Sequence, residues 1–292
     1  MLQKKLTQIF KKNLQIAILS VFAFIFNYHY GFIGIMPMDN TVLYNGGFRV
    51  LNGFVPFTDY WLVTGPLLDY LNAFFFKIFG INWSSFIIHS SIFNSLIALS
   101  TYIFLIKTRL DKNKAFFYSI LLSILFYPVV GTPFVDHHST FFLILIYYLF
   151  TIGIFEKKLK LFVFIPILFC LSFLSKQTPS SYGLLMFFPL LLIFFYFFKD
   201  KIILTILYLF IGTIISIFLV FNFFYFANID ISNFLTQYIY FASSVGDFRL
   251  TTYDPKFIDL LHEFKFLVFF IFLLFLTLIN LIKNFKRKKE EI

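Results

Sequence analysis

Residues 202–226 read IILTILYLFIGTIISIFLVFNFFYF, a run of twenty-five residues without a charged side chain. A helix of this length rises about 37 Å, which is enough to cross the roughly 30 Å hydrocarbon core of a bilayer. The whole chain has a similar character, because 60% of its 292 residues are hydrophobic and only 13% are charged. Soluble proteins carry about a quarter charged residues. The sequence therefore predicts an integral membrane protein.

Further apolar runs flank this segment on both sides. They cover residues 14–35, 83–106, 115–130, 139–155, 161–175, 183–198 and 264–282. With 202–226, they predict an all-α polytopic protein of about eight transmembrane helices, folded as a single transmembrane domain over 1–292. The run 161–175 is short, so a re-entrant pair with 183–198 stays open as an alternative.

The basic residues indicate how the chain is oriented. In this arrangement eighteen of the twenty-four fall on one side of the membrane: Lys4, Lys5, Lys11, Lys12, Lys107, Arg109, Lys112, Lys114, Lys157, Lys158, Lys160, Lys199, Lys201, Lys283, Lys286, Arg287, Lys288 and Lys289. The positive-inside rule makes that side cytoplasmic. We therefore expect a multi-pass protein of the cell (inner) membrane with both termini in the cytoplasm. The net charge of +10 reflects this topology and predicts no nucleic-acid partner.

Two outer loops are long enough to hold structure of their own. The first, 36–82, contains an amphipathic stretch at 66–79 that is too short to span and predicts a helix lying at the membrane interface, started by Pro66 and stopped by Gly80. The last, 227–263, predicts a second interfacial helix with Ser232 as N-cap, followed by a mobile loop from Val245.

Carboxylates gather in these outer loops and are almost absent from the apolar runs. An ion-coupled transporter usually keeps an ionisable residue at mid-membrane, so this distribution argues against one. His89 is the nearest candidate, and we interpret it as a hydrogen-bonded helix histidine near the outer end. Asp39 follows the first span directly. As a general base it would deprotonate an acceptor hydroxyl; as a structural residue it would cap a helix starting near Thr41.

The first outer loop also carries a family resemblance. It contains GFRVLNGFVPFTDYW followed by TGPLLDYLNAFFFKIFG, and these segments resemble the polytopic GT-C glycosyltransferases, the group of the protein O-mannosyltransferases and lipid A aminoarabinose transferases (glycosyltransferase family 39-like). Members frequently share a Gly-x-x-Pro-[Tyr/Phe]-x-Asp stretch and a downstream Gly-Pro-Leu helix. The matching residues here are Gly53, Pro56, Phe57, Asp59, Gly65, Pro66 and Leu67.

The resemblance implies an inverting enzyme that uses a polyprenyl-phosphate sugar donor, with Asp39 as the catalytic base. Many relatives carry an acidic pair where this chain has Asp39-Asn40, so a divalent metal is not indicated at that point and no cofactor is expected. Many relatives are also longer, and acceptor recognition is therefore not transferred from them.

Other polar residues are candidates for substrate binding. They are Arg49, Asp59, Asp69, Asp136, His137, His138, Lys176, Gln177 and Arg249. For Lys176 and the two arginines, a phosphate contact and a lipid-headgroup contact both fit the chemistry. For Asp136 to His138 we favour hydrogen bonds to a sugar or phosphate over a metal, with a helix cap as the alternative.

These observations predict a membrane glycosyltransferase that moves a sugar from a polyprenyl-phosphate donor in the membrane lipid to a lipid, glycan or protein acceptor at the extracytoplasmic face. Phosphate-loop, zinc-protease and nucleophile-elbow motifs are missing from the sequence. Two alternatives stay open. One is a glycolipid or polysaccharide flippase or transporter, and the other is a non-catalytic glycolipid-binding membrane subunit.

Overall fold

The computed structural model describes residues 2–34, 36–252, 256, 258–259 and 272. The chain divides into two compact units, Met1–Phe241 and Ala242–Ile292. The described residues form helices and no β-strand, so the predicted all-α class is confirmed. The predicted span 264–282 lies outside the described residues, and a single domain over 1–292 stays a prediction.

Seven longer helices account for the other predicted runs. They are α1 (Leu2–Tyr30), α4 (Trp83–Lys107), α5 (Lys112–Leu125), α6 (Val135–Phe155), α7 (Phe164–Ser175), α8 (Gln177–Phe197) and α9 (Ile202–Phe226). Of the described helices, α4, α6, α8 and α9 are long and apolar enough to cross a membrane, whereas the apolar parts of α1 and α7 are shorter. The 3-10 turns η1 (Tyr127–Val129), η2 (Leu159–Val163) and η3 (Lys199–Lys201) link them.

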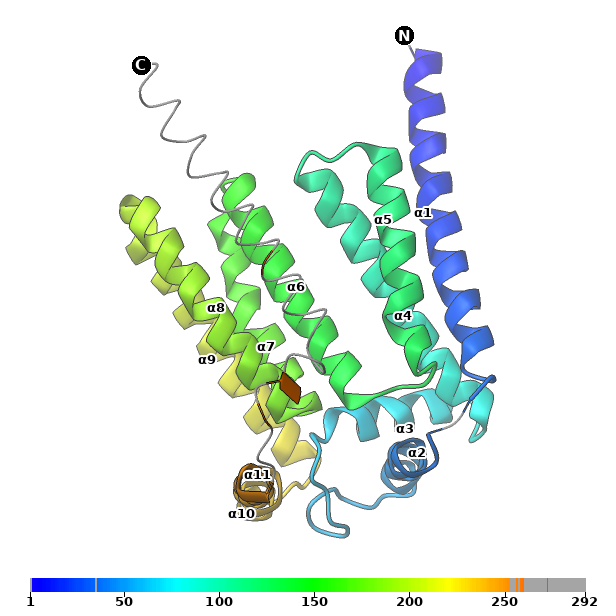
Figure 1. Ribbon diagram of the computed structural model, residues 1–292, viewed down its shortest axis with the longest axis vertical. Coiled ribbons are helices and arrows are strands. Elements are labelled where there is room, and N and C mark those ends of the chain that lie inside the picture. The colour runs from blue at the N-terminus through cyan, green and yellow to red at the C-terminus, as the bar shows by residue number, and fades with distance from the viewer. Residues whose placement is uncertain (1, 35, 253–255, 257, 260–271, 273–292) are drawn as a thin grey trace. The chain divides into compact units, whose positions relative to one another are not determined.

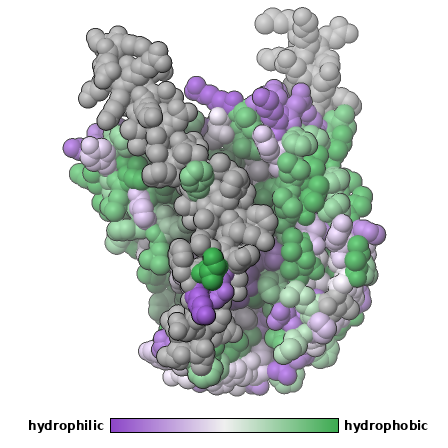
Figure 2. Space-filling view, in the orientation of Figure 1, coloured by the Kyte–Doolittle hydropathy of each residue, from purple (hydrophilic) through white to green (hydrophobic). Residues whose placement is uncertain are grey.

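The outer surfaces of these helices are apolar. On α8 and α9 the exposed side chains include Met186, Ile203 and Phe218, and Figure 2 shows green hydrophobic surface along the flanks with purple hydrophilic residues gathered at the upper end. Side chains of this kind are stable in contact with lipid tails and costly in contact with water. Together with the helix lengths, they support a multi-pass membrane protein.

Buried amides join α1, α4 and α5. The Asn94 side chain of α4 donates to the carbonyl oxygens of Ala23 (2.8 Å) and Ser123 (2.9 Å), and Asn27 of α1 donates to Ser90 and Ser91, each at 3.0 Å. Because lipid offers no hydrogen bonds, such polar contacts help to hold helices together inside a membrane. These mid-helix polar residues are thus engaged in packing.

A second group of helices packs through small residues and phenylalanines. Gly212 of α9 lies so close to η2 that a Cβ atom would come within 2.2 Å of the Val163 carbonyl oxygen. Phe150, Phe162 and Phe194 form a common buried cluster. This packing holds α6 to α9 together and fixes where the connection between α7 and α8 lies.

Two short helices run across one end of the longer ones (Figure 1). α2 (Pro37–Leu51) begins with Pro37 at its first position, and α3 (Leu67–Phe79) follows Pro66 and ends at Gly80, whose φ of +84° suits glycine. The helix predicted at 66–79 is therefore present. The helix expected near Thr41 starts four residues earlier.

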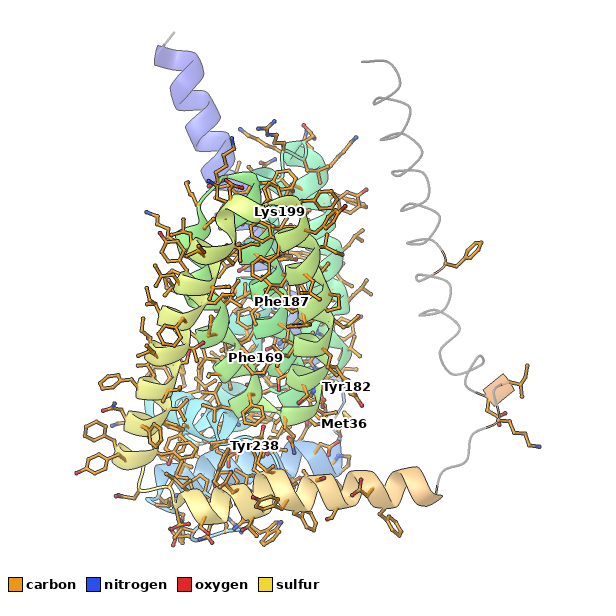
Figure 3. The ribbon with its side chains drawn as sticks, turned by 90° about the vertical axis from the view of Figure 1, so that its left-hand side faces the viewer. Met36, Phe169, Tyr182, Phe187, Lys199 and Tyr238 are labelled. Atoms are coloured by element: carbon orange, nitrogen blue, oxygen red, sulfur yellow. The ribbon has the colours of Figure 1, made fainter. Side chains whose placement is uncertain are left out.

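The segment after α9 is helical from Ile231 to Thr252. α10 (Ile231–Phe234), the π-helix η4 (Leu235–Tyr240) and α11 (Phe241–Thr252) follow one another. The cap is Asp230, whose carboxylate accepts from the Asn233 N–H at 2.7 Å, so the prediction of Ser232 was wrong. The loop expected from Val245 is also wrong as far as Thr252, because α11 continues there. Figure 3 shows Tyr238 and Met36 at one end of the molecule's first unit and Lys199 at the opposite end.

Candidate functional site

Asp39 lies in the first turn of α2 with its side chain exposed. The N-cap position is held by Met36, and no side chain caps this helix, so the cap interpretation of Asp39 was wrong. None of the described residues forms a hydrogen bond or ion pair with the Asp39 carboxylate. A carboxylate at a helix N-terminus is favoured by the helix dipole, and this one is exposed.

Asn40 points the other way, into the protein. Its Oδ1 accepts a hydrogen bond of 2.9 Å from the Thr132 hydroxyl, and both residues are fully buried. This contact joins the first turn of α2 to the segment that leads into α6. Asn40, the neighbour of Asp39, therefore anchors the first turn of α2.

Asp136 and Lys176 come together although forty residues separate them. The Lys176 Nζ lies 2.8 Å from Asp136 Oδ2, and both side chains are about one-third exposed. Asp136 belongs to the first turn of α6, and Lys176 sits between α7 and α8 in extended backbone. Thr132 and Asp136 flank the start of α6, which links this ion pair to the start of α2.

Gln177 has a structural position beside this pair. Its amide nitrogen donates to the carbonyl oxygens of Val63 and Tyr238, each at 3.3 Å. The backbone around it is also tight, since a Cβ on Gly65 would fall within 1.8 Å of the Leu174 carbonyl oxygen. The Gly-Pro-Leu segment is thus anchored where α7 ends.

Asp69 is buried between α2 and α3. The Tyr60 hydroxyl donates to its Oδ2 at 2.6 Å, and the Arg49 guanidinium lies 5.0 Å from the centre of the Tyr60 ring. Burial raises the pKa of the Asp69 carboxyl to about 7, although the Tyr60 hydrogen bond and the Arg49 charge both act to lower that pKa. Gly46 of α2 leaves the room that this carboxyl occupies. Asp69 therefore organises the contact between two helices.

A chain of polar side chains continues inward from α3. The Asn72 amide donates to the Leu43 carbonyl at 3.1 Å, which turns its oxygen toward His89 Nδ1 at 2.7 Å. His89 Nε2 then lies 3.0 Å from Nε2 of His138. All three of these side chains are fully buried. His89 is therefore the hydrogen-bonded helix histidine expected from the sequence, and His138 forms part of the same core.

The remaining predicted residues do not join the Asp136–Lys176 ion pair. Arg49 is ten residues from Asp39 along α2, or about 15 Å. The Asp59 carboxylate accepts from the Val55 N–H at 2.7 Å and closes the turn before α3. His137 packs against the rings of Tyr127 and Phe126. The side chain of Arg249 lies outside the described residues.

Several of the residues that organise this end were not identified from the sequence. Asn72 and Gln237 bind residues that are distant along the chain, so no local spacing marks them, and Tyr60 binds Asp69 nine residues later. Gln237 bonds the backbone at Phe57 (2.7 Å) and Leu62 (2.9 Å). Within the described part of the chain, no group of three His, Cys, Asp or Glu side chains is arranged to hold a metal ion.

Apolar cavities open beside this end, between α7 and α9. One of about 300 Å³ extends to Phe234 and Leu235, and another of about 230 Å³ extends to Leu67 of α3. Cys170, Leu174 and Val220 line both. The two cavities share this wall of α7 and α9, and together they are called the apolar groove. Lys176 follows Leu174 by two residues in the chain and lines neither cavity.

Comparison with known families identifies the chain. Residues 63–225, more than half of it, match the family of dolichyl-phosphate-mannose-protein mannosyltransferases. The chain belongs to this family. Searches of curated proteins and of solved structures gave no match. Family membership makes it a membrane glycosyltransferase of the GT-C kind.

The match to the mannosyltransferase family covers α3 to α9. It contains the ion pair of Asp136 with Lys176, the buried Asp69 and the apolar groove. Asp39 and Arg49 precede the matched residues. The contact of Asn40 with Thr132 joins the α2 start to the part that the family defines.

Proposed function

We propose that this protein transfers a sugar from a polyprenyl-phosphate donor to a lipid, glycan or protein acceptor at the extracytoplasmic face of the cell membrane, with inversion at the sugar carbon. One observation carries the proposal: the apolar groove between α7 and α9 is lined by Leu174, and the chain reaches Lys176 two residues later, where α7 ends. A polyprenyl chain fits apolar walls of this kind, and its phosphate would then lie near the Lys176 ammonium.

Asp39 is the proposed base. Its carboxylate is exposed, and Asn40, Thr132 and the start of α6 connect it to the Asp136–Lys176 pair. In the reaction, Asp39 would take the proton of the acceptor hydroxyl while that oxygen bonds to the sugar carbon and the bond from this carbon to the phosphate oxygen breaks. Lys176 would offset the charge of the departing phosphate.

The proposed face follows from the distribution of charge. The lysines of the 107–114 and 156–160 connections lie at one end of the first unit, where Glu156 bridges Lys107 and Lys158. Positive residues favour the cytoplasmic side. We therefore place α2, α3 and the groove on the extracytoplasmic side, with the N-terminus in the cytoplasm. Both termini would be cytoplasmic if the run 264–282 crosses the membrane.

The test compares a deletion strain carrying wild type, Asp39→Asn or Asp200→Asn at equal membrane abundance. Asp200 is an exposed acid at the opposite end of the unit, beside Lys201, and serves as the matched control. Mass spectrometry of envelope glycans and polyprenyl-phosphate sugars should show one missing sugar and an accumulated donor with Asp39→Asn, and a normal profile with Asp200→Asn.

A normal profile with Asp39→Asn would refute its role as base. If the deletion itself changes the distribution of a glycolipid across the membrane without loss of a sugar, the flippase alternative is supported instead. In a third outcome, Asp39→Asn gives a normal glycan profile, whereas the deletion strain lacks the sugar and also loses the activity of a second enzyme. The protein would then act as a non-catalytic subunit.

A further inference from the structure

A second cavity lies at the end of the first unit that is opposite to α2 and α3. It has a volume of about 650 Å³ and is formed by the connection from α6 to η2, the end of α8, η3 and the start of α9. Lys199, in η3, marks this end in Figure 3. The cavity is therefore separate from the proposed transfer site, and its role does not depend on that proposal.

One side of the cavity is strongly basic. Lys157, Lys158, Lys160 and Lys201 line it, together with a single acid, Asp200. Two of these lysines have an acidic neighbour: Lys158 lies 2.6 Å from Glu156, and Lys201 lies 2.8 Å from Asp200. Lys157 and Lys160 have no ion-pair partner within the described residues. The cavity thus presents two uncompensated ammonium groups.

The opposite side is aromatic and aliphatic. Phe194 and Phe198 stack with their ring centres 5.0 Å apart, and Leu204 of α9 continues the same wall. A soluble anion such as free phosphate would gain nothing from these side chains. A molecule with a charged head and an apolar tail would contact both sides.

The backbone holds the lysines at this place. α6 ends at Phe155, and Lys157 two residues later has φ +54°, a left-handed conformation that glycine or asparagine usually adopts after a helix end. The Lys158 N–H bonds back to the Gly153 carbonyl at 2.8 Å. A side chain other than glycine is strained in this region, because its Cβ atom approaches the following carbonyl oxygen. Lysine is nevertheless present, which is consistent with a use for its charge.

We propose that this cavity binds an anionic phospholipid of the surrounding leaflet. Lys157 and Lys160 contact the headgroup phosphate, and the acyl chains run along Phe198 and Leu204. Basic cavities between membrane helices on the cytoplasmic side suit such headgroups, and the positive-inside distribution places this cavity there. The bound lipid would join α6, α8 and α9 at the end remote from the transfer site.

The test uses the full chain, purified from membranes and reconstituted in nanodiscs. The nanodiscs contain phosphatidylcholine with about one-fifth phosphatidylglycerol. Native mass spectrometry then counts the phosphatidylglycerol retained after release. Two double variants are compared, Lys157→Gln with Lys160→Gln, and Lys112→Gln with Lys114→Gln. The second pair removes the same charge from the first turn of α5, outside the cavity.

Each lysine near an anionic surface changes binding by roughly five-fold, so the first pair should weaken retention by about 25-fold. The control pair should leave it close to wild type. An equal loss of retained phosphatidylglycerol in both double variants would show that the basic end attracts anionic lipid in general. That result would overturn the proposal.

A second arm separates the lipid from free phosphate. In detergent without lipid, short-chain phosphatidylglycerol should raise the unfolding temperature of the wild type, whereas the same concentration of inorganic phosphate should not. An equal rise with inorganic phosphate would show that the apolar wall is unused, and the site would then be a simple anion site.

Discussion

The Tyr60 hydroxyl donates a hydrogen bond of 2.6 Å to Asp69, a carboxyl that is fully buried between α2 and α3. Tyr60 lies in the turn that precedes α3, and the Arg49 guanidinium of α2 sits over its ring. One carboxyl therefore joins both short helices and the loop between them. Because Asp39 is on α2, the position of the proposed base depends on this contact.

The protonation of Asp69 should make stability depend on pH. Its pKa is about 7 in the folded protein, against an ordinary value of 3.8, because burial disfavours the charge. The folded state then binds more protons than the unfolded state between these values, so this contribution to stability is complete below about pH 4 and is lost as the pH rises through 7. Asp69→Asn should remove this loss of stability, because the amide does not titrate.

The unfolding temperature, monitored by tryptophan fluorescence, should fall in the wild type relative to the variant from pH 5 to 8. Unfolding temperatures that change in parallel with pH would contradict this role of Asp69.

Gly46→Ala should separate the two short helices. The added Cβ would lie 2.2 Å from the nearest Asp69 carboxylate oxygen, and overpacking of this kind costs about 1–3 kcal/mol. We expect a lower unfolding temperature and a loss of sugar transfer, because α2 must move. Gly34→Ala is the control, since among the described residues no atom beyond its chain neighbours lies within 4 Å of the added Cβ. Equal unfolding temperatures and equal transfer activities in the two variants would contradict the proposed contact between α2 and α3.

The Lys176 ion pair should matter for activity and little for stability. Both partners are about one-third exposed, and pairs of this kind contribute about 0–1 kcal/mol. Lys176→Gln should raise the KM for the donor at least several-fold, whereas Asp136→Asn should leave the KM near wild type because the ammonium remains. Steady-state kinetics with a polyprenyl-phosphate sugar would measure this. A larger effect of Asp136→Asn would assign the donor contact to the acid.

Gln237→Leu should loosen the first outer loop. The Gln237 side chain satisfies the Phe57 carbonyl and the Leu62 N–H, and each backbone group left buried without a partner costs about 1–3 kcal/mol. Limited proteolysis should cut between Phe57 and Leu62 faster in the variant. Asn222→Leu removes an exposed amide that bonds only its own helix, so it should leave the cleavage rate unchanged.

The sequence by itself determined the membrane class, the helices and the family. Uncharged runs such as 202–226 cannot be kept in water, and proline and glycine at Pro66 and Gly80 set the bounds of α3 through local geometry. The Gly-Pro-Leu segment was likewise recognisable, because its conformation depends on neighbours in the chain. These features require only information that is contiguous in sequence.

Tertiary structure alone decided which polar residues meet. Asp69 and His138 looked like pocket residues, but packing buries them against Tyr60 and His89, and a polar side chain in lipid or in a core must find its partner wherever the fold supplies one. Lys176 and Asp136, in contrast, stay partly exposed and paired across forty residues. Helix packing decides whether a charged side chain faces a substrate or the core. The spacing of residues in the sequence does not predict this.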